Sequence, residues 1–154
     1  MLSEEEKREI EEEFKLYPDK KAASIEAMKV VQKHRGWLSD ESLRDLSQIL
    51  GLSVEDLDGT ATFYNLLYRE PVGKHVILVC NSISCFVMGY NEILRAVSDR
   101  LGIKYGETTS DGMFTLLPVP CLGTCDRAPA IMIDKDLHRD LRPEDLGKIL
   151  ENYK

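Results

Sequence analysis

The chain has 154 residues and a formal net charge of −7, with apolar and charged fractions that are ordinary for a soluble globular protein. A chain of this length buries roughly 70% of its unfolded surface, so it needs no metal or disulfide merely to fold. The acidic balance argues against nucleic-acid binding through a basic patch. It argues equally against docking on anionic lipid through the chain's own charge.

The sequence carries no targeting or membrane signal that we recognise. No apolar run approaches the roughly 18 residues of a membrane span. The start, MLSEEEKREIEEEF, is acidic and lacks an apolar segment, so it resembles neither a secretory signal nor a transit peptide. We therefore expect a cytoplasmic chain without membrane insertion, in a reducing compartment where cysteines serve as metal ligands or redox thiols rather than structural disulfides.

Residues 1–70 carry helical patterns and predict a small helical bundle. Ser3 and Glu6 match a capping box, and Gly36 is a stop signal. The expected helices are residues 3–16, residues 20–34, a segment through Leu43, Leu46 and Leu50 that ends at Gly51, and a segment capped by Ser53 with Val54, Leu57, Ala61 and Tyr64 on one face.

The pattern changes after the turn REPVGK, and residues 71–154 read as a second domain. The expected elements are a strand at 75–80, a helix at 90–101 ended by Gly102, strands at 113–119 and 130–134, and a final helix opened by Pro143. A parallel strand–helix–strand unit followed by an antiparallel strand pair and a helix gives an α+β domain with a thioredoxin-like layout.

Four cysteines, Cys80, Cys85, Cys121 and Cys125, form two separate pairs with four and three intervening residues. The first pair follows the first expected strand closely, and the second pair follows the second expected strand. In this layout the strand ends bring both pairs to one edge of the sheet. The small neighbours Asn81, Ser82, Ser84, Gly123 and Thr124 let backbone N–H groups approach the sulfurs.

Four interpretations of the two pairs compete. A structural zinc site takes four thiolates, but its common turns use C-x2-C, and neither pair has that spacing. Thioredoxin-type dithiol chemistry uses C-x-x-C at a helix N-terminus, which this sequence does not contain. Buried free cysteines without a ligand fit poorly with two loop pairs. We favour an iron–sulfur cluster, because each iron of a [2Fe–2S] centre takes two thiolates.

At these residues the chain resembles the thioredoxin-like [2Fe–2S] subunit family of respiratory complex I, which in bacteria supplies the E subunit of NADH–quinone oxidoreductase. The resemblance runs almost from end to end. It is carried by YPDKKAASIEAMKVVQ with the following GWLS, by GTATFYNLLYREPVGKHVILVC and by GETTSDGMFTLLPVPCLGTCDRAPAIMID.

The resemblance implies one [2Fe–2S] cluster, with Cys80 and Cys85 on one iron and Cys121 and Cys125 on the other. It implies an electron-transfer subunit rather than a chain that turns over NADH by itself. The implied partner is a neighbouring subunit that binds FMN and NADH, and the implied place is the cytoplasmic face of the inner membrane, reached through the complex. We expect the bundle of residues 1–70 to bind that partner, since the cluster domain is already a complete fold.

Other functions stay open at this point. The equivalent subunit of an NAD-linked hydrogenase or formate dehydrogenase shares the motifs, and a free-standing ferredoxin shares the cluster domain. A zinc-stabilised interaction module is the alternative from another class. No catalytic residue is expected, and His34, His75 and His138 are expected to be exposed and without a function. The trans form is the default for Ala128–Pro129.

Overall fold

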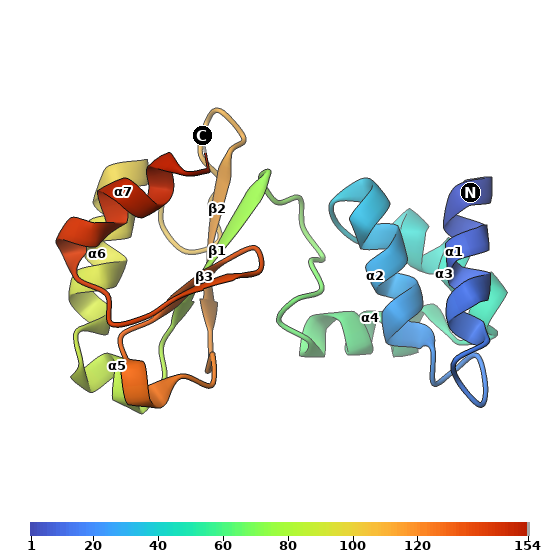
Figure 1. Ribbon diagram of the computed structural model, residues 1–154. Helices are drawn as coiled ribbons and strands as arrows, with labels where there is room; N and C mark the ends of the chain where they lie inside the picture. Colours follow the sequence, from blue (N-terminus) through green and yellow to red (C-terminus); the bar gives the residue numbers. More distant parts are fainter. Residues whose placement is uncertain (154) are drawn as a thin grey trace. The chain divides into compact units, whose positions relative to one another are not determined.

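The computed structural model describes residues 1–153, and the chain divides into two compact units (Figure 1). The N-terminal unit is Met1–Pro71, and the C-terminal unit is Val72–Lys154. None of the helices within residues 1–153 has both the length and the apolar character that crossing a bilayer requires.

The first 71 residues form four α-helices, α1 Glu4–Phe14, α2 Ser24–Arg35, α3 Asp40–Leu50 and α4 Val54–Phe63. The capping box is confirmed: the Glu6 N–H donates to Ser3 Oγ over 3.2 Å, and the Ser3 N–H donates to the Glu6 carboxylate over 2.6 Å. Glycines at positive φ follow α2 and α3, as the stop signals predict. The core of this unit includes the fully buried side chains Ile10, Met28, Leu38, Leu43, Leu46 and Leu57.

Two details of the predicted bundle are wrong. The second helix begins at Ser24 rather than near Lys20, because the chain turns after Pro18 and the Asp19 carboxylate accepts the Ala22 N–H over 2.8 Å. Tyr64 does not continue the buried face of α4, since the helix ends at Phe63 and the Tyr64 side chain is exposed.

Within residues 72–153 four strands form one sheet in the order β2-β1-β3-β4. They are β1 His75–Cys80, β2 Phe114–Val119, β3 Ile131–Ile133 and β4 Asp136–His138. Strand β1 pairs parallel with β2 and antiparallel with β3, which pairs antiparallel with β4. The expected parallel pair with an antiparallel continuation is confirmed, but the sequence pattern does not predict β4.

Three helices accompany this sheet within residues 72–153, and two of them pack on it through an apolar core. The three helices are α5 Ile83–Val87, α6 Tyr90–Leu101 and α7 Leu146–Glu151, with short 3₁₀ turns at Cys125–Arg127 and Pro143–Asp145. Figure 1 shows α6 and α7 on the same side of the sheet. The core between them includes Ile77, Val79, Ile93, Val97, Leu146 and Leu150. The predicted α+β class is therefore confirmed, whereas α5 is an additional helix and the Ala128–Pro129 peptide bond is cis rather than trans.

Replacing either of two glycines by alanine is expected to change the stability of the protein, in opposite directions. A Cβ at Gly73 would lie 2.8 Å from the Gly112 carbonyl oxygen, so backbone must move to admit it. We expect Gly73→Ala to lower the free energy of unfolding of the C-terminal unit by about 1–3 kcal/mol. Gly59 lies inside α4 with nothing within 4 Å of the added methyl, so Gly59→Ala should stabilise the N-terminal unit by about 0.5–1 kcal/mol.

Urea unfolding followed by circular dichroism measures both changes. Trp37, which is the single tryptophan of the chain, lies in the N-terminal unit, so its fluorescence follows that unit separately. A Gly73→Ala protein as stable as the wild type would contradict the close backbone approach at this turn.

Candidate metal centre

The two cysteine pairs follow the carboxyl ends of neighbouring parallel strands. Cys80 is the last residue of β1 and stands opposite Val119, which is the last residue of β2. The Asn81 N–H donates to the Val119 carbonyl over 3.1 Å, so the two strands leave the sheet side by side. Parallel pairing therefore delivers both cysteine loops to one edge of the sheet.

The first pair, Cys80 and Cys85, is buried. The Cys80 N–H donates to the Ala130 carbonyl over 3.2 Å, which ties the end of β1 to the segment before β3. Cys85 lies inside α5 and is 1% exposed. Burial raises the pKa of the Cys85 thiol to about 11, and its interaction with Cys80 acts in the same direction. As a free thiol Cys85 is protonated at neutral pH, so an electropositive metal is needed to hold it as a thiolate.

The second pair, Cys121 and Cys125, is exposed, and its sulfurs lie 4.0 Å apart. The Gly123 N–H donates to Cys121 Sγ over 3.2 Å, and Gly123 adopts φ +71°, a left-handed conformation that glycine takes without strain. This backbone donor, followed by the Cys125 side chain, lowers the pKa of the Cys121 thiol. The loop therefore favours the thiolate form of Cys121 more than an unperturbed cysteine would.

Interactions between the pairs link all four thiols. The side chains of Ser82 and Cys80 contribute to the lowered pKa of the Cys121 thiol, and a negative charge on Cys125 raises the pKa of the Cys85 thiol. Within residues 1–153 no three His, Cys, Asp or Glu side chains converge to hold a single metal ion. A two-iron cluster asks for only two thiolates at each iron, which the two chain-local pairs supply.

Other groups near the thiols were not identified from the sequence. A backbone hydrogen bond from Ala130 reaches the Cys85 thiol and lowers its pKa. The hydroxyls of Tyr90 and Tyr105 lie 3.0 Å apart, and the charge of Cys80 acts on Tyr105. Each of these contacts joins residues that are distant along the chain, so no local motif marks them.

The expected exposure of the three histidines holds for only one of them. His34 is exposed and pairs with Glu9 over 3.1 Å. His75 is half-buried, and its Nδ1 lies 2.6 Å from Asp134 Oδ2. His138 is also half-buried, with Nε2 3.1 Å from the Tyr153 hydroxyl. The prediction is wrong for His75 and His138, which are half-buried where they contact Asp134 and Tyr153.

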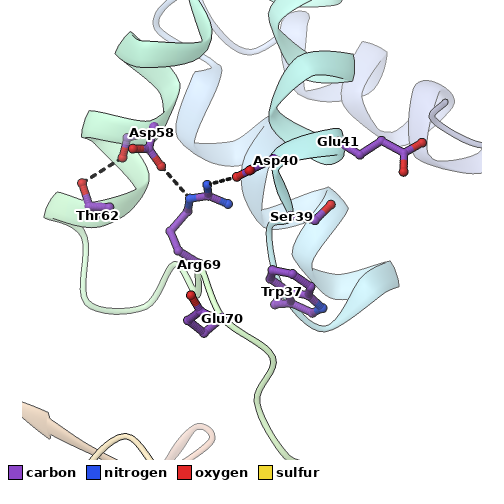
Figure 2. A pocket seen from close by; sticks show the side chains of 8 residues that line it. All are labelled: Trp37, Ser39, Asp40, Glu41, Asp58, Thr62, Arg69 and Glu70. Atoms are coloured by element: carbon purple, nitrogen blue, oxygen red, sulfur yellow. Dashed lines mark hydrogen bonds and ion pairs between the residues drawn. The ribbon is translucent and has the colours of Figure 1, made fainter.

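The N-terminal unit has a separate surface cavity, shown in Figure 2. Arg69 occupies its centre: Nε lies 2.7 Å from Asp58 Oδ1, Nη2 lies 2.6 Å from Asp40 Oδ1, and Nη1 donates to the Leu38 carbonyl. These contacts satisfy the guanidinium within the protein and fix the end of the bundle. The other lining residues are Trp37, Ser39, Glu41, Thr62 and Glu70.

The cysteine loops and the sheet that carries them agree with a known protein family. Residues 10–154 match the family described as thioredoxin-like [2Fe-2S] ferredoxin. The chain belongs to this family.

The sequence similarity between this thioredoxin-like ferredoxin and its relatives extends over nearly the whole chain. The E subunit of NADH-quinone oxidoreductase from Pseudomonas aeruginosa is 50% identical over 153 residues, which cover 99% of this chain and 92% of that protein. The protein of the same name in Escherichia coli K12 is 49% identical with the same coverage. The resemblance to the [2Fe–2S] subunit of NADH–quinone oxidoreductases is therefore confirmed.

A solved structure shares the fold of the thioredoxin-like ferredoxin. It is an NAD+-reducing [NiFe]-hydrogenase in the air-oxidized state, with a TM-score of 0.72 and 21% identity. The match covers 85% of this chain but only 22% of the hydrogenase chain, so the ferredoxin spans about a fifth of that protein.

Proposed function

We propose that this chain is the electron-transfer subunit of an NADH–quinone oxidoreductase, respiratory complex I. Cys80 and Cys85 would hold one iron of a [2Fe–2S] cluster, and Cys121 and Cys125 would hold the other. The observation that carries the proposal is that the parallel strands β1 and β2 end at one sheet edge with a cysteine pair each, where Cys121 interacts with Cys80 and Cys125 with Cys85. The half-identical relatives, which are E subunits of NADH-quinone oxidoreductases, support the assignment to this complex.

The thiols favour electron transfer over bond-making chemistry. When bound, a [2Fe–2S] cluster accepts and releases one electron at a time. Four thiolates would fill the protein positions at both irons, which leaves no place for a substrate. Backbone donors at Gly123 and Ala130 would stabilise negative charge on the sulfurs. The chain itself is therefore not expected to oxidise NADH.

The partner in this proposal is the subunit that binds NADH and FMN, and the complex places the chain at the cytoplasmic face of the membrane. The buried ligand candidate Cys85 has exposed apolar neighbours on α5 and at the end of this helix. They are Ile83, Phe86, Val87 and Met88, which are between 54% and 76% exposed. An exposed apolar group of this kind beside a redox centre suits a protein interface. Electron exchange also requires the partner to come close to the cluster.

The N-terminal unit is proposed as a second contact with the same partner. Phe63, Tyr64 and Leu66 are exposed at and just beyond the end of α4. The rings of Phe63 and Tyr64 pack edge to face, with their centroids 5.2 Å apart. Aromatic side chains left in water in this way are enriched at protein interfaces. Loss of residues 1–70 with unchanged binding of the flavin subunit would contradict this role.

The equivalent subunit of an NAD-linked hydrogenase or formate dehydrogenase is the second candidate. It is compatible with the fold shared with the hydrogenase chain. The sequence relatives at about half identity favour the quinone-linked complex instead.

Anaerobic purification tests the cluster, and copurification tests the complex. We expect about two irons and two acid-labile sulfides per chain, no zinc, and an S = 1/2 EPR signal after dithionite reduction. A tagged chain in its native organism should copurify with an NADH-oxidising flavoprotein and quinone-reducing subunits. Zinc without sulfide would leave an interaction module, and copurified hydrogenase or formate dehydrogenase subunits would favour the second candidate.

A charge on α5 should weaken the complex without removing the cluster. Val87 is 74% exposed, so Val87→Lys should leave the fold intact while placing a cation inside the proposed interface. We expect affinity for the flavin subunit to fall at least about tenfold, or ~1.4 kcal/mol, with iron content unchanged. Leu137→Lys, which changes an exposed leucine of β4, is the matched control and should bind normally.

A further inference from the structure

A buried hydroxyl without a hydrogen-bond partner lies in the second cysteine loop. Thr124 is 7% exposed. Its Oγ1 is one of two buried side-chain nitrogen or oxygen atoms within residues 1–153 that have no hydrogen-bond partner. The other is Asp45 Oδ2, which has cationic neighbours, the terminal amino group at 3.1 Å and Arg35 at 4.0 Å. Charged neighbours therefore explain the burial of Asp45 Oδ2, whereas no hydrogen bond explains that of the threonine hydroxyl, and a buried hydroxyl left in this state is costly.

The position of Thr124 points to the missing acceptor. It follows Gly123, whose N–H donates to Cys121 Sγ, and it directly precedes Cys125. Its own carbonyl accepts the Arg127 N–H over 3.0 Å, so this backbone oxygen already has a partner. The group that the four thiols would hold is rich in sulfur acceptors, and it would lie next to this hydroxyl.

We infer that the Thr124 hydroxyl donates a hydrogen bond to a sulfur of the [2Fe–2S] cluster and thereby raises its reduction potential. The inference rests on the proposed function, because it needs the cluster at the four cysteines. Reduction adds negative charge to the cluster, so a donor to sulfur stabilises the reduced form more than the oxidised form. Thr124 is in this sense a positioning residue for electron transfer and not a ligand.

Three variants at one position separate the hydroxyl from the shape of the side chain. Thr124→Val keeps the volume and removes the donor, Thr124→Ala removes the donor and the methyl group, and Thr124→Ser keeps the donor. The full chain, purified anaerobically with its cluster, is titrated potentiometrically and followed by EPR. Iron and acid-labile sulfide are measured in every sample.

We expect Thr124→Val and Thr124→Ala to keep the cluster and to be reduced less readily. The equilibrium constant for reduction should fall about tenfold, which is ~59 mV for a one-electron couple. Thr124→Ser should stay close to the wild type. If Val and Ala fail to load while Ser loads, the hydroxyl is needed to hold the cluster, which also supports the contact.

Two results would overturn the inference. One is a loaded Thr124→Val protein with an unchanged potential, which would place water rather than sulfur against the hydroxyl. The other is a Thr124→Ser protein that behaves like Thr124→Val, either in potential or in failure to load, which would show that keeping the hydroxyl does not preserve the wild-type behaviour. A wild-type chain without iron and sulfide would instead contradict the proposed function itself.

Discussion

Replacing Cys121 by alanine is expected to remove nearly all iron and acid-labile sulfide from the chain. Cys121 would be one of only two protein ligands on its iron, and its loss opens that iron to solvent and to release. The wild type should hold about two irons and two sulfides. The visible absorption of the cluster and the EPR signal after dithionite reduction should disappear together with the metal.

The exposed pair gives the sharper test of the ligand assignment. Cys80 and Cys85 are buried, so alanine there also leaves a void in the packed interior. Cys121 and Cys125 are exposed, and their side chains lie outside the apolar core of the C-terminal unit. Circular dichroism of Cys121→Ala should therefore match that of the cluster-free wild type, which separates loss of metal from loss of fold.

Asp126→Asn is the matched control for this experiment. Asp126 lies beside Cys125 in the same loop, and its side chain is exposed. The variant should load iron and sulfide like the wild type. Full iron and sulfide in Cys121→Ala, with the fold intact, would show that the cluster is held by other groups.

The convergence of the cysteines could be predicted because it follows from local rules. The apolar run that ends at Cys80 and the one that ends at Val119 both read as strands, and parallel strands place their carboxyl ends at one edge. The unequal surroundings of the two pairs could not be predicted in this way. Burial of Cys85 depends on how α5 packs, and α5 has only five residues, too few for a helical period to be visible.

Strand β4 escaped prediction for a similar reason. It has three residues, Asp136–His138, which carry no apolar alternation. The turn that precedes β4 is held by residues of β1. Asp134 in this turn adopts φ 54°, accepts the Val76 N–H over 3.0 Å and pairs with His75 over 2.6 Å. These partners lie almost sixty positions away along the chain, so only the folded sheet brings them together.

A largely buried ion pair joins two helices of the N-terminal unit. The Glu6 side chain is 3% exposed and lies 2.6 Å from Arg35 Nε, while its other oxygen accepts the Nη2–H of the same guanidinium over 2.9 Å. This two-pronged contact links α1 to the end of α2. The Arg35 guanidinium lowers the pKa of the Glu6 carboxyl from its usual 4.5 to about 2, and the capping bonds with Ser3 act in the same direction.

The lowered pKa makes the stability of this unit depend on pH in a defined window. Folding favours the ionised form of the Glu6 carboxyl, because its pKa is lower in the folded protein than in the unfolded chain. The stabilisation is therefore fully present above about pH 4.5 and is lost as the pH falls toward 2. The shift corresponds to about 3 kcal/mol. Glu6→Gln should lose about this amount at pH 7, because glutamine can keep the cap to Ser3 but leaves Arg35 without a counter-ion.

Urea unfolding followed by Trp37 fluorescence between pH 2 and pH 7 measures the effect within the N-terminal unit. The difference between wild type and Glu6→Gln should be largest above pH 4.5 and close to zero near pH 2. Glu4→Gln is the control, since the Glu4–Lys7 pair is exposed and surface pairs contribute little. Parallel pH curves for wild type and Glu6→Gln would mean that desolvation of the two charges cancels their attraction, leaving the apolar core and the helix caps to hold α1 in place.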